Sequence, residues 1–224
     1  MVYEFIVSFQ IMYIGIHFDI SCGCVTIIYT KRTLTELKIN IFYLHHEPID
    51  CAAMHNDKHT IKMILEYAQL LSTAHRYLDG TLTVSLSDSG RKRQTYTLDS
   101  NLDAILYRAT HINHPSAVWV RKGVQHYHWL YSLLVALCKE YTFRYGKVHK
   151  VEREGLMDAL RVTPKNIPQD TYWSEPTPAM PDEVKVEGNS IASYRAYYIN
   201  NKTHLASWRG KINSRNTPDW FQTT

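Results

Sequence analysis

The sequence predicts a mainly α-helical protein: a compact helical domain with an inserted β-hairpin and a proline-rich excursion before a C-terminal helix. Three observations support this fold class. Apolar residues make up 45% of the 224 residues, which is enough for one packed core. Apolar side chains recur every three or four positions over long stretches, as in amphipathic helices, whereas one stretch alternates as a strand does. We place the domain at residues 39–224, after an extension of residues 1–38.

Residues 1–38 differ in composition from the rest of the chain. They are rich in Ile, Tyr, Phe and Val but show no helical period. Two interpretations stay open: a pair of short β-strands, or an extension of doubtful role that follows from an upstream start site. No apolar run reaches the roughly 18 residues of a membrane-spanning helix, and no basic start or cleavage site marks a secretory signal. We therefore expect a cytoplasmic protein without a membrane partner.

Local signals mark where the first helices begin and end. Pro48 suits the first turn of a helix, because it lacks the backbone N–H that would be unpaired there. Asn56 or Asp57 can cap the next helix, and Gly80 can end it. The elements expected here are a strand or extended entry at 39–44 and helices at 48–54 and 58–77.

An alternating pattern follows the long helix. Leu82, Val84 and Leu86 point to one side of a strand, and residues 87–90 have the composition of a turn. A basic return strand begins at residues 91–93. This pattern predicts a β-hairpin over about residues 81–98, inserted between helices.

The second half of the chain returns to helical spacing. Leu130, Leu134 and Leu137 belong to the apolar stripe of a long helix that Gly146 ends, and Pro115 begins a shorter helix before it. Five prolines interrupt the residues that follow position 162. The elements expected here are helices at 102–110, 115–121, 124–145 and 149–161, the proline-rich segment at about 163–190, and a C-terminal helix at 191–208.

The helix at 58–77 carries a polar line on an otherwise apolar surface. His59, Lys62, Glu66, Gln69 and Thr73 recur at spacings of three and four, so they share one side of the helix. One interpretation is a solvated side with an ordinary Lys62–Glu66 pair. The other is a cleft in which Glu66 is a catalytic acid or base, with His59 and Lys62 beside it. In that case burial should raise the pKa of Glu66 and Lys62 should lower it.

Metal and cofactor sites have weaker support in the sequence. His55 and His59 are one helical turn apart and could bind a metal ion if a third ligand converged on them. The chain has no glycine-rich phosphate loop and no serine nucleophile elbow. We therefore expect no cofactor and assign no metal site, although a metal-dependent enzyme that uses a His cluster stays open as an alternative.

Basic and aromatic residues interleave in two stretches, one at 141–150 and the other at 194–202. Cations can hold phosphates while aromatic faces stack on bases, so this pattern is typical of nucleic-acid surfaces. The same pattern also fits amphipathic helices whose tyrosines pack inward. The candidate DNA-binding residues, with those of the loop near residue 114, are Asn113, His114, Arg121, Arg144, Lys147, Tyr194, Arg195, Tyr197, Tyr198 and Lys202.

Three of these segments resemble the pyrimidine-dimer DNA glycosylases of the phage endonuclease V type. The likeness covers residues 39–208 and skips the hairpin and the proline-rich segment. His59 and Glu66 have the spacing seen on the family's first long helix, where its catalytic glutamate lies. Residues 113–115 are similar to a loop before a later helix, and residues 193–198 to the family's aromatic DNA contact. The chain also resembles uncharacterised phage-encoded proteins that begin at the equivalent of Ile39.

The resemblance implies a base-excision glycosylase and AP lyase that acts on damaged pyrimidines in duplex DNA, inside an infected host cell. An amine attacks C1′ and forms a Schiff base, and Glu66 assists sugar opening and β-elimination. The family uses its N-terminal amine, whereas residues 1–38 precede Ile39 here. It also has arginines beside its glutamate, where this chain has Leu65 and Gln69. A phage protein that binds nucleic acid or a host factor without catalysis is the other main hypothesis.

Overall fold

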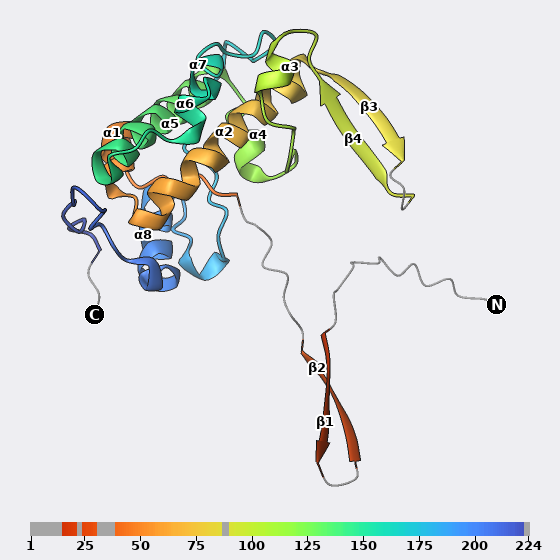
Figure 1. The fold of residues 1–224 in the computed structure, drawn as a ribbon. Coiled ribbons are helices and arrows are strands. Elements are labelled where there is room, and N and C mark those ends of the chain that lie inside the picture. Colours follow the sequence, from red (N-terminus) through yellow and green to blue (C-terminus); the bar gives the residue numbers. More distant parts are fainter. Residues whose placement is uncertain (1–14, 22–23, 31–38, 87–89, 222–224) are drawn as a thin grey trace. The chain divides into compact units, whose positions relative to one another are not determined.

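A computed structural model describes residues 15–21, 24–30, 39–86 and 90–221 of the chain. The chain divides into two compact units, Met1–Lys38 and Ile39–Thr224 (Figure 1). In the first unit, β1 (Gly15–Ser21) pairs antiparallel with β2 (Cys24–Thr30). The pair of short strands that the composition allowed is therefore present.

The second unit is mainly α-helical with an inserted β-hairpin, which confirms the predicted fold class. The two longest helices, α2 and α5, pack against each other, with α1 on α5 and α4 on α2 (Figure 1). The hairpin extends away from the helices at the end of α2. Among the described residues, no helix is both long enough and apolar enough to cross a membrane. The elements are α1 (Pro48–Met54), α2 (Asp57–Asp79), β3 (Thr81–Leu86), β4 (Lys92–Thr97), α3 (Leu102–Ile105), α4 (Pro115–Val120), α5 (Val124–Tyr145), α6 (Lys150–Arg153), α7 (Leu156–Ala159), the 3-10 turn η1 (Asp182–Val184), α8 (Ser190–Asn201) and the 3-10 turn η2 (Thr203–Leu205).

The ends of the two long helices have different causes. Asn56 caps α2, because its side chain accepts a hydrogen bond from the backbone N–H of His59. Gly146 ends α5 in the left-handed conformation, with φ of 63°. Gly80 ends α2 with φ of −91°, so its role is not conformational. A Cβ atom at Gly80 would lie 2.4 Å from the carbonyl oxygen of Arg76, which explains why glycine fits there.

Three predicted helices are shorter in the structure. α3 stops at Ile105, because the next carbonyl groups, those of Leu106 and Tyr107, accept hydrogen bonds from Arg76 instead of continuing the helix. The helix expected at 149–161 is divided into α6 and α7 at Gly155, whose φ of 77° interrupts the helical path. The C-terminal helix ends at Asn201 rather than Trp208.

The entry segment, Ile39–Leu44, is extended and buried but pairs with no strand among the described residues. It crosses the core beside α2 and α8. The hydroxyl of Tyr67 on α2 accepts a hydrogen bond from the backbone N–H of Phe42, and the hydroxyl of Ser116 donates to the carbonyl of Ile39. The core thus holds the first residues of the helical unit in a defined position.

The proline-rich segment is also held against the helices. The carboxylate of Asp79 accepts hydrogen bonds from the backbone N–H groups of Lys165 and Asn166. The indole of Trp119 on α4 donates to the carbonyl of Ser174. Residues 163–190 therefore form an ordered excursion that leads from α7 to α8, as the sequence predicted.

Candidate functional site

Glu66 lies in the middle of α2, with one carboxylate oxygen paired and the other buried. The ammonium of Lys62 lies 2.8 Å from Oε1 of Glu66. The Lys62 side chain is 54% exposed, whereas that of Glu66 is 9% exposed. The ammonium end of the pair is therefore in contact with solvent, and the carboxylate end is buried. Oε2 of Glu66 is buried and has no hydrogen-bond partner among the described residues. A buried carboxylate with one free oxygen is unusual in a folded protein.

The surroundings of Glu66 raise the pKa of its carboxyl group. Desolvation by burial is the largest cause. Three neighbours act in the opposite direction: Lys62 through its hydrogen bond and charge, the backbone N–H of Asn40, and the charge of His111. The i,i+4 pair with Lys62 is present, but the carboxylate of Glu66 is buried, so the solvated interpretation of the polar line does not hold for Glu66. Its carboxyl group has a raised pKa, as is common for acids and bases in active sites.

Asn40, in the entry segment, also influences the Glu66 carboxyl group. Its backbone N–H acts on the Glu66 carboxylate, and its own side-chain Oδ1 is buried without a partner among the described residues. The entry segment therefore delivers a main-chain nitrogen to the carboxylate. In the sequence, Asn40 was recognisable only as a polar residue inside an apolar run, and we did not assign it to the site.

His59 lies about two turns before Glu66 on the same helix and is buried. Its Nδ1 lies 2.5 Å from the hydroxyl of Tyr198 on α8, and its ring stacks on Phe42 with centroids 4.3 Å apart. Burial holds the pKa of His59 well below its usual value, and the charges of Lys202 and Lys62 act in the same direction. His59 is therefore a neutral ring that supports the site from inside.

His55 does not complete a metal site with His59. Its Nδ1 lies 2.7 Å from the carbonyl oxygen of Cys51, and its Nε2 lies 3.2 Å from the hydroxyl of Tyr67. Burial lowers its pKa to about 4. Both ring nitrogens are thus engaged within the protein. Among the described residues, no group of three or more His, Cys, Asp or Glu is placed to hold a metal ion.

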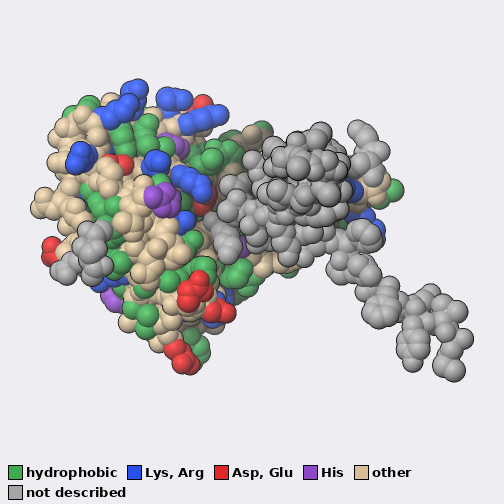
Figure 2. Space-filling view, turned by 90° about the horizontal axis from the view of Figure 1, so that it is seen from below, with side chains coloured by type: hydrophobic (Ala, Val, Ile, Leu, Met, Phe, Trp, Pro, Cys, Tyr) green, Lys and Arg blue, Asp and Glu red, His purple; other side chains and the backbone are tan. Residues whose placement is uncertain are grey.

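Basic side chains influence the pKa values of His59 and Glu66. The pKa of His59 responds to Lys202, Lys62 and His204, and that of Glu66 to Lys62 and His111. We call these four residues, Lys62, His111, Lys202 and His204, the cationic rim. Figure 2 shows that Lys, Arg and His side chains gather in the upper part of the face in view, whereas acidic side chains are more frequent toward its lower end. Such a surface favours an anionic partner.

The tyrosines of α8 are not available for stacking on bases. Tyr194 and Tyr198 are fully buried, and Tyr197 is 8% exposed. The hydroxyl of Tyr194 donates to the carbonyl of Thr177, and that of Tyr198 contacts His59. Their assignment as DNA contacts is corrected: the aromatic side of α8 packs into the core, because a helix next to α2 must bury its apolar surface.

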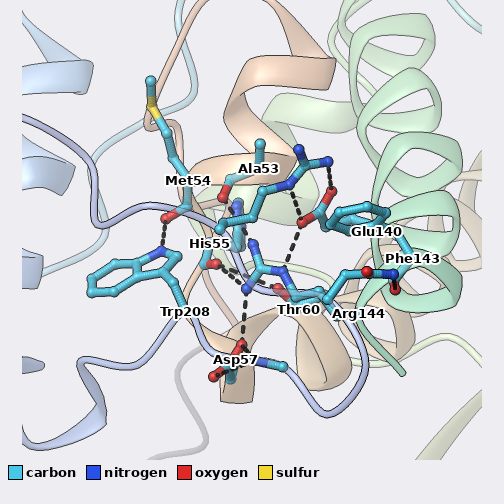
Figure 3. Close-up of polar contacts among 12 residues, drawn as sticks. Ala53, Met54, His55, Asp57, Thr60, Glu140, Phe143, Arg144 and Trp208 are labelled. Atoms are coloured by element: carbon cyan, nitrogen blue, oxygen red, sulfur yellow. Dashed lines mark hydrogen bonds and ion pairs between the residues drawn. The ribbon is translucent and has the colours of Figure 1, made fainter. Parts of the chain in front are cut away.

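Arg144 is also a core residue rather than a DNA contact (Figure 3). It is fully buried. Its guanidinium lies 2.7 Å from a carboxylate oxygen of Glu140 and 3.1 Å from one of Asp57, and it donates to the carbonyl groups of Ala53 and His55. The guanidinium thus joins α5 to the α1–α2 connection. A buried cation with this many partners cannot also reach a phosphate in solvent.

Arg195 has a similar internal role. Its Nε and one terminal nitrogen donate to the carbonyl of Leu44, and its guanidinium lies 5.3 Å from the ring centroid of Trp220. It therefore fixes the end of the entry segment against α8. The segment that carries Asn40 is held in place partly by this contact.

The remaining candidates lie at or near the surface. Asn113 and Lys147 are exposed. The side chain of His114 caps α4 by accepting from the backbone N–H of Ser116. Arg121 donates to the carbonyl of Ile112 and lies 4.1 Å from the ring centroid of Tyr77. Lys202 lies 4.9 Å from the ring centroid of Tyr197. The structure brings Lys202, but not Lys147, into the surroundings of His59.

Comparisons of the chain with protein-family models, with curated proteins and with solved structures give no match. Its function is therefore argued from the chemistry of the site, because a fold by itself does not define an activity.

Proposed function

We propose that the helical unit is a DNA glycosylase and AP lyase, with Glu66 as its acid/base residue and the nitrogen of residue 40 as its nucleophile. One observation carries the proposal: the backbone N–H of Asn40 lowers the pKa of the buried Glu66 carboxyl group, as a group near that carboxylate does. Placing a nitrogen nucleophile beside a carboxylate of raised pKa is the arrangement that Schiff-base chemistry at a sugar carbon needs.

The nitrogen becomes a nucleophile only in a chain that begins at Asn40. In the 224-residue chain it is part of a peptide bond. With a free amine, nitrogen attacks C1′, the glycosidic bond breaks, and the damaged base leaves with a proton. Ring opening gives an imine. Glu66 then removes a proton from C2′, and the 3′ phosphate leaves by β-elimination.

The cationic rim supports the proposal independently of the nucleophile. Lys62 and Lys202 are basic side chains near a site whose own carboxylate is withdrawn from solvent. Phosphate groups would be attracted to the rim rather than repelled by Glu66. Duplex DNA, with the damaged nucleotide turned out of the stack, is the substrate that we infer.

The test compares chains that begin at Asn40 and at Ile39 with the full chain. Each protein is incubated with ultraviolet-damaged duplex and borohydride, which reduces an imine to a stable adduct. We expect a trapped adduct and strand nicking for the Asn40 chain. Replacing Glu66 by Gln in that chain should slow nicking by about 100-fold or more. The absence of both adduct and nicking in the two shortened chains, if they are folded by circular dichroism, would refute the proposal.

Binding of nucleic acid without catalysis is the second candidate. The cationic rim is present in the full chain, where the nitrogen of Asn40 is acylated and cannot attack. In this case Glu66→Gln should leave duplex binding unchanged, whereas Lys62→Ala with Lys202→Ala should weaken it and reduce its dependence on salt. Equal salt dependence of the double variant and the unaltered chain would contradict this function.

A further inference from the structure

A polar cleft lies at the opposite end of α2 from His59. It has a volume of about 600 Å³ and is formed where β4 meets α3 and the segment after it. Figure 1 shows the hairpin leaving the helical body at this place. The lining side chains that matter for its chemistry are Arg76, Arg93, Thr95, Asp103 and Arg108.

One arginine and one carboxylate of the cleft neutralise each other. Arg76 lies 2.5 Å from Asp103 and also donates to the carbonyl groups of Tyr96 and Leu106. The hydrogen bond from the backbone N–H of Leu98 and the pairing with Arg76 lower the pKa of Asp103. The carboxylate is therefore ionised and occupied, and it adds no net negative charge to the cleft. Arg76 lines the cleft, but its guanidinium is already engaged with groups of the protein.

The other two arginines have no such partner. Arg93 on β4 and Arg108 after α3 are both exposed, and neither guanidinium forms a hydrogen bond or ion pair with another described residue. Asp103 pairs with Arg76, so among the described residues that line the cleft the guanidinium groups of Arg93 and Arg108 have no carboxylate partner. The side chain of Thr95 adds a hydroxyl donor. Two guanidinium groups and a hydroxyl around a polar hollow are suited to a phosphate group.

A segment of the chain connects this cleft to Glu66. Leu106 lies against Arg76 through a hydrogen bond, and further along Thr110 forms two hydrogen bonds with Thr73. His111 then contributes its charge to the surroundings of Glu66. The segment thus runs along α2 in the reverse direction, and it places positive side chains at both ends.

The separation suits one duplex. Ten residues of α2 separate Glu66 from Arg76, which corresponds to about 15 Å at 1.5 Å per residue. Base pairs are stacked about 3.4 Å apart, so this distance spans four to five of them, roughly half a helical turn.

We propose that the cleft between β4 and α3 is a second DNA contact, in which Arg93 and Arg108 hold a backbone phosphate about four to five base pairs from the nucleotide at Glu66. This inference rests on the proposed role in nucleic-acid binding but not on the lyase chemistry. In this proposal the hairpin extends the DNA-binding surface, and β4 supplies Arg93 as a phosphate contact.

The experiment measures binding of the full chain to undamaged duplex of about 20 base pairs, two helical turns, over a series of salt concentrations. The test variant is Arg93→Ala/Arg108→Ala. The matched control is Lys139→Ala/Arg153→Ala, which removes two exposed positive charges outside the cleft. Arg93→Lys/Arg108→Lys keeps the charge. Thermal unfolding of each variant checks that it is folded.

We expect the test variant to bind about tenfold more weakly and its salt slope to fall by about one to two, at roughly 0.9 per lost phosphate contact. The control and the lysine variant should keep the slope of the unaltered chain. Equal slopes in the test and control variants would overturn the inference. Stabilisation by inorganic phosphate without any duplex binding would also overturn it, because it would indicate a free-phosphate site. Undamaged duplex requires no lyase activity, so this outcome is separate from that of the borohydride test.

Discussion

The backbone N–H of Asn40, in the entry segment, lowers the pKa of the Glu66 carboxyl group on α2, against the raising effect of burial. The segment is extended and has one internal backbone hydrogen bond, from Leu44 to the carbonyl of Phe42, so its direction is set mainly by contacts with the surrounding helices. Tyr67, Ser116 and Arg195 provide those contacts from three different helices. The pairing of nitrogen and carboxylate therefore depends on the whole helical unit, and it is the feature on which the proposed chemistry depends.

Glu66→Gln should change how stability depends on pH. Burial raises the folded-state pKa of Glu66 above its usual value, so the unfolded chain loses this proton first as pH rises. The free energy of unfolding contributed by Glu66 is present at low pH and is lost as pH rises through the folded-state pKa. Chemical denaturation of both proteins between pH 4 and pH 8 should show the unaltered chain losing stability relative to Glu66→Gln. A constant difference across this range would contradict the raised pKa.

His55 should make the protein sensitive to acid. Its folded-state pKa is about 4, below the usual value of 6.5, so only the unfolded chain binds this proton between those values. The free energy of unfolding should fall as pH decreases through this window, by about 3 kcal/mol at most. His55→Gln should flatten the fall, although it also weakens the contact with Tyr67. The exposed His128→Gln is the control and should leave the fall unchanged.

Arg144→Met should destabilise the protein strongly without a specific effect on DNA. The change removes the buried cation between Glu140 and Asp57, so Glu140 keeps only Arg215 and Asp57 keeps only the Ser207 hydroxyl and backbone N–H groups, which costs about 3 kcal/mol or more. Urea denaturation measures this loss. Lys147→Met, an exposed change on the same stretch, should lie within about 0.5 kcal/mol of the unaltered chain. Similar stabilities of the two variants would contradict the buried role of Arg144.

Tyr198→Phe should destabilise the helical unit through His59. The change removes the hydroxyl that lies 2.5 Å from Nδ1 of His59 and leaves a buried ring nitrogen without this partner, at a cost of about 1 to 3 kcal/mol. Tyr197→Phe on the next position is the matched control, because no hydrogen bond of its hydroxyl joins it to the described residues. We expect thermal unfolding to show a clear decrease in the melting temperature for Tyr198→Phe only.

Several features could be predicted from residues near one another in the sequence. The cap at Asn56, the end of α5 at Gly146 and the alternation of Leu82, Val84 and Leu86 all act over one turn of helix or a few strand positions. For this reason the helices, the hairpin and the polar line that contains Glu66 are visible in the sequence alone. The predictions that were wrong concern where helices end. At the end of α3, for example, hydrogen bonds from the distant Arg76 replace those within the helix.

Which side of an amphipathic helix faces solvent was decided by the tertiary structure. The spacing of tyrosines on α8 and of cations on α5 is the same for a DNA-binding surface and for a core surface. Only the packing of these helices shows that Tyr194 and Arg144 lie inside, because a side chain is buried by neighbours that are distant in the sequence.

By itself, the sequence determined the fold class and identified Glu66 as a candidate acid or base. The tertiary structure decided the surroundings of Glu66: Lys62 pairs with its carboxylate, and the backbone N–H of Asn40 and the side chain of His111 lower its pKa. It also decided that Arg93 and Arg108 share one cleft. The physical reason is that a local pattern sets the geometry of one helix or strand, whereas burial, pKa and the convergence of charges are properties of segments brought together by folding.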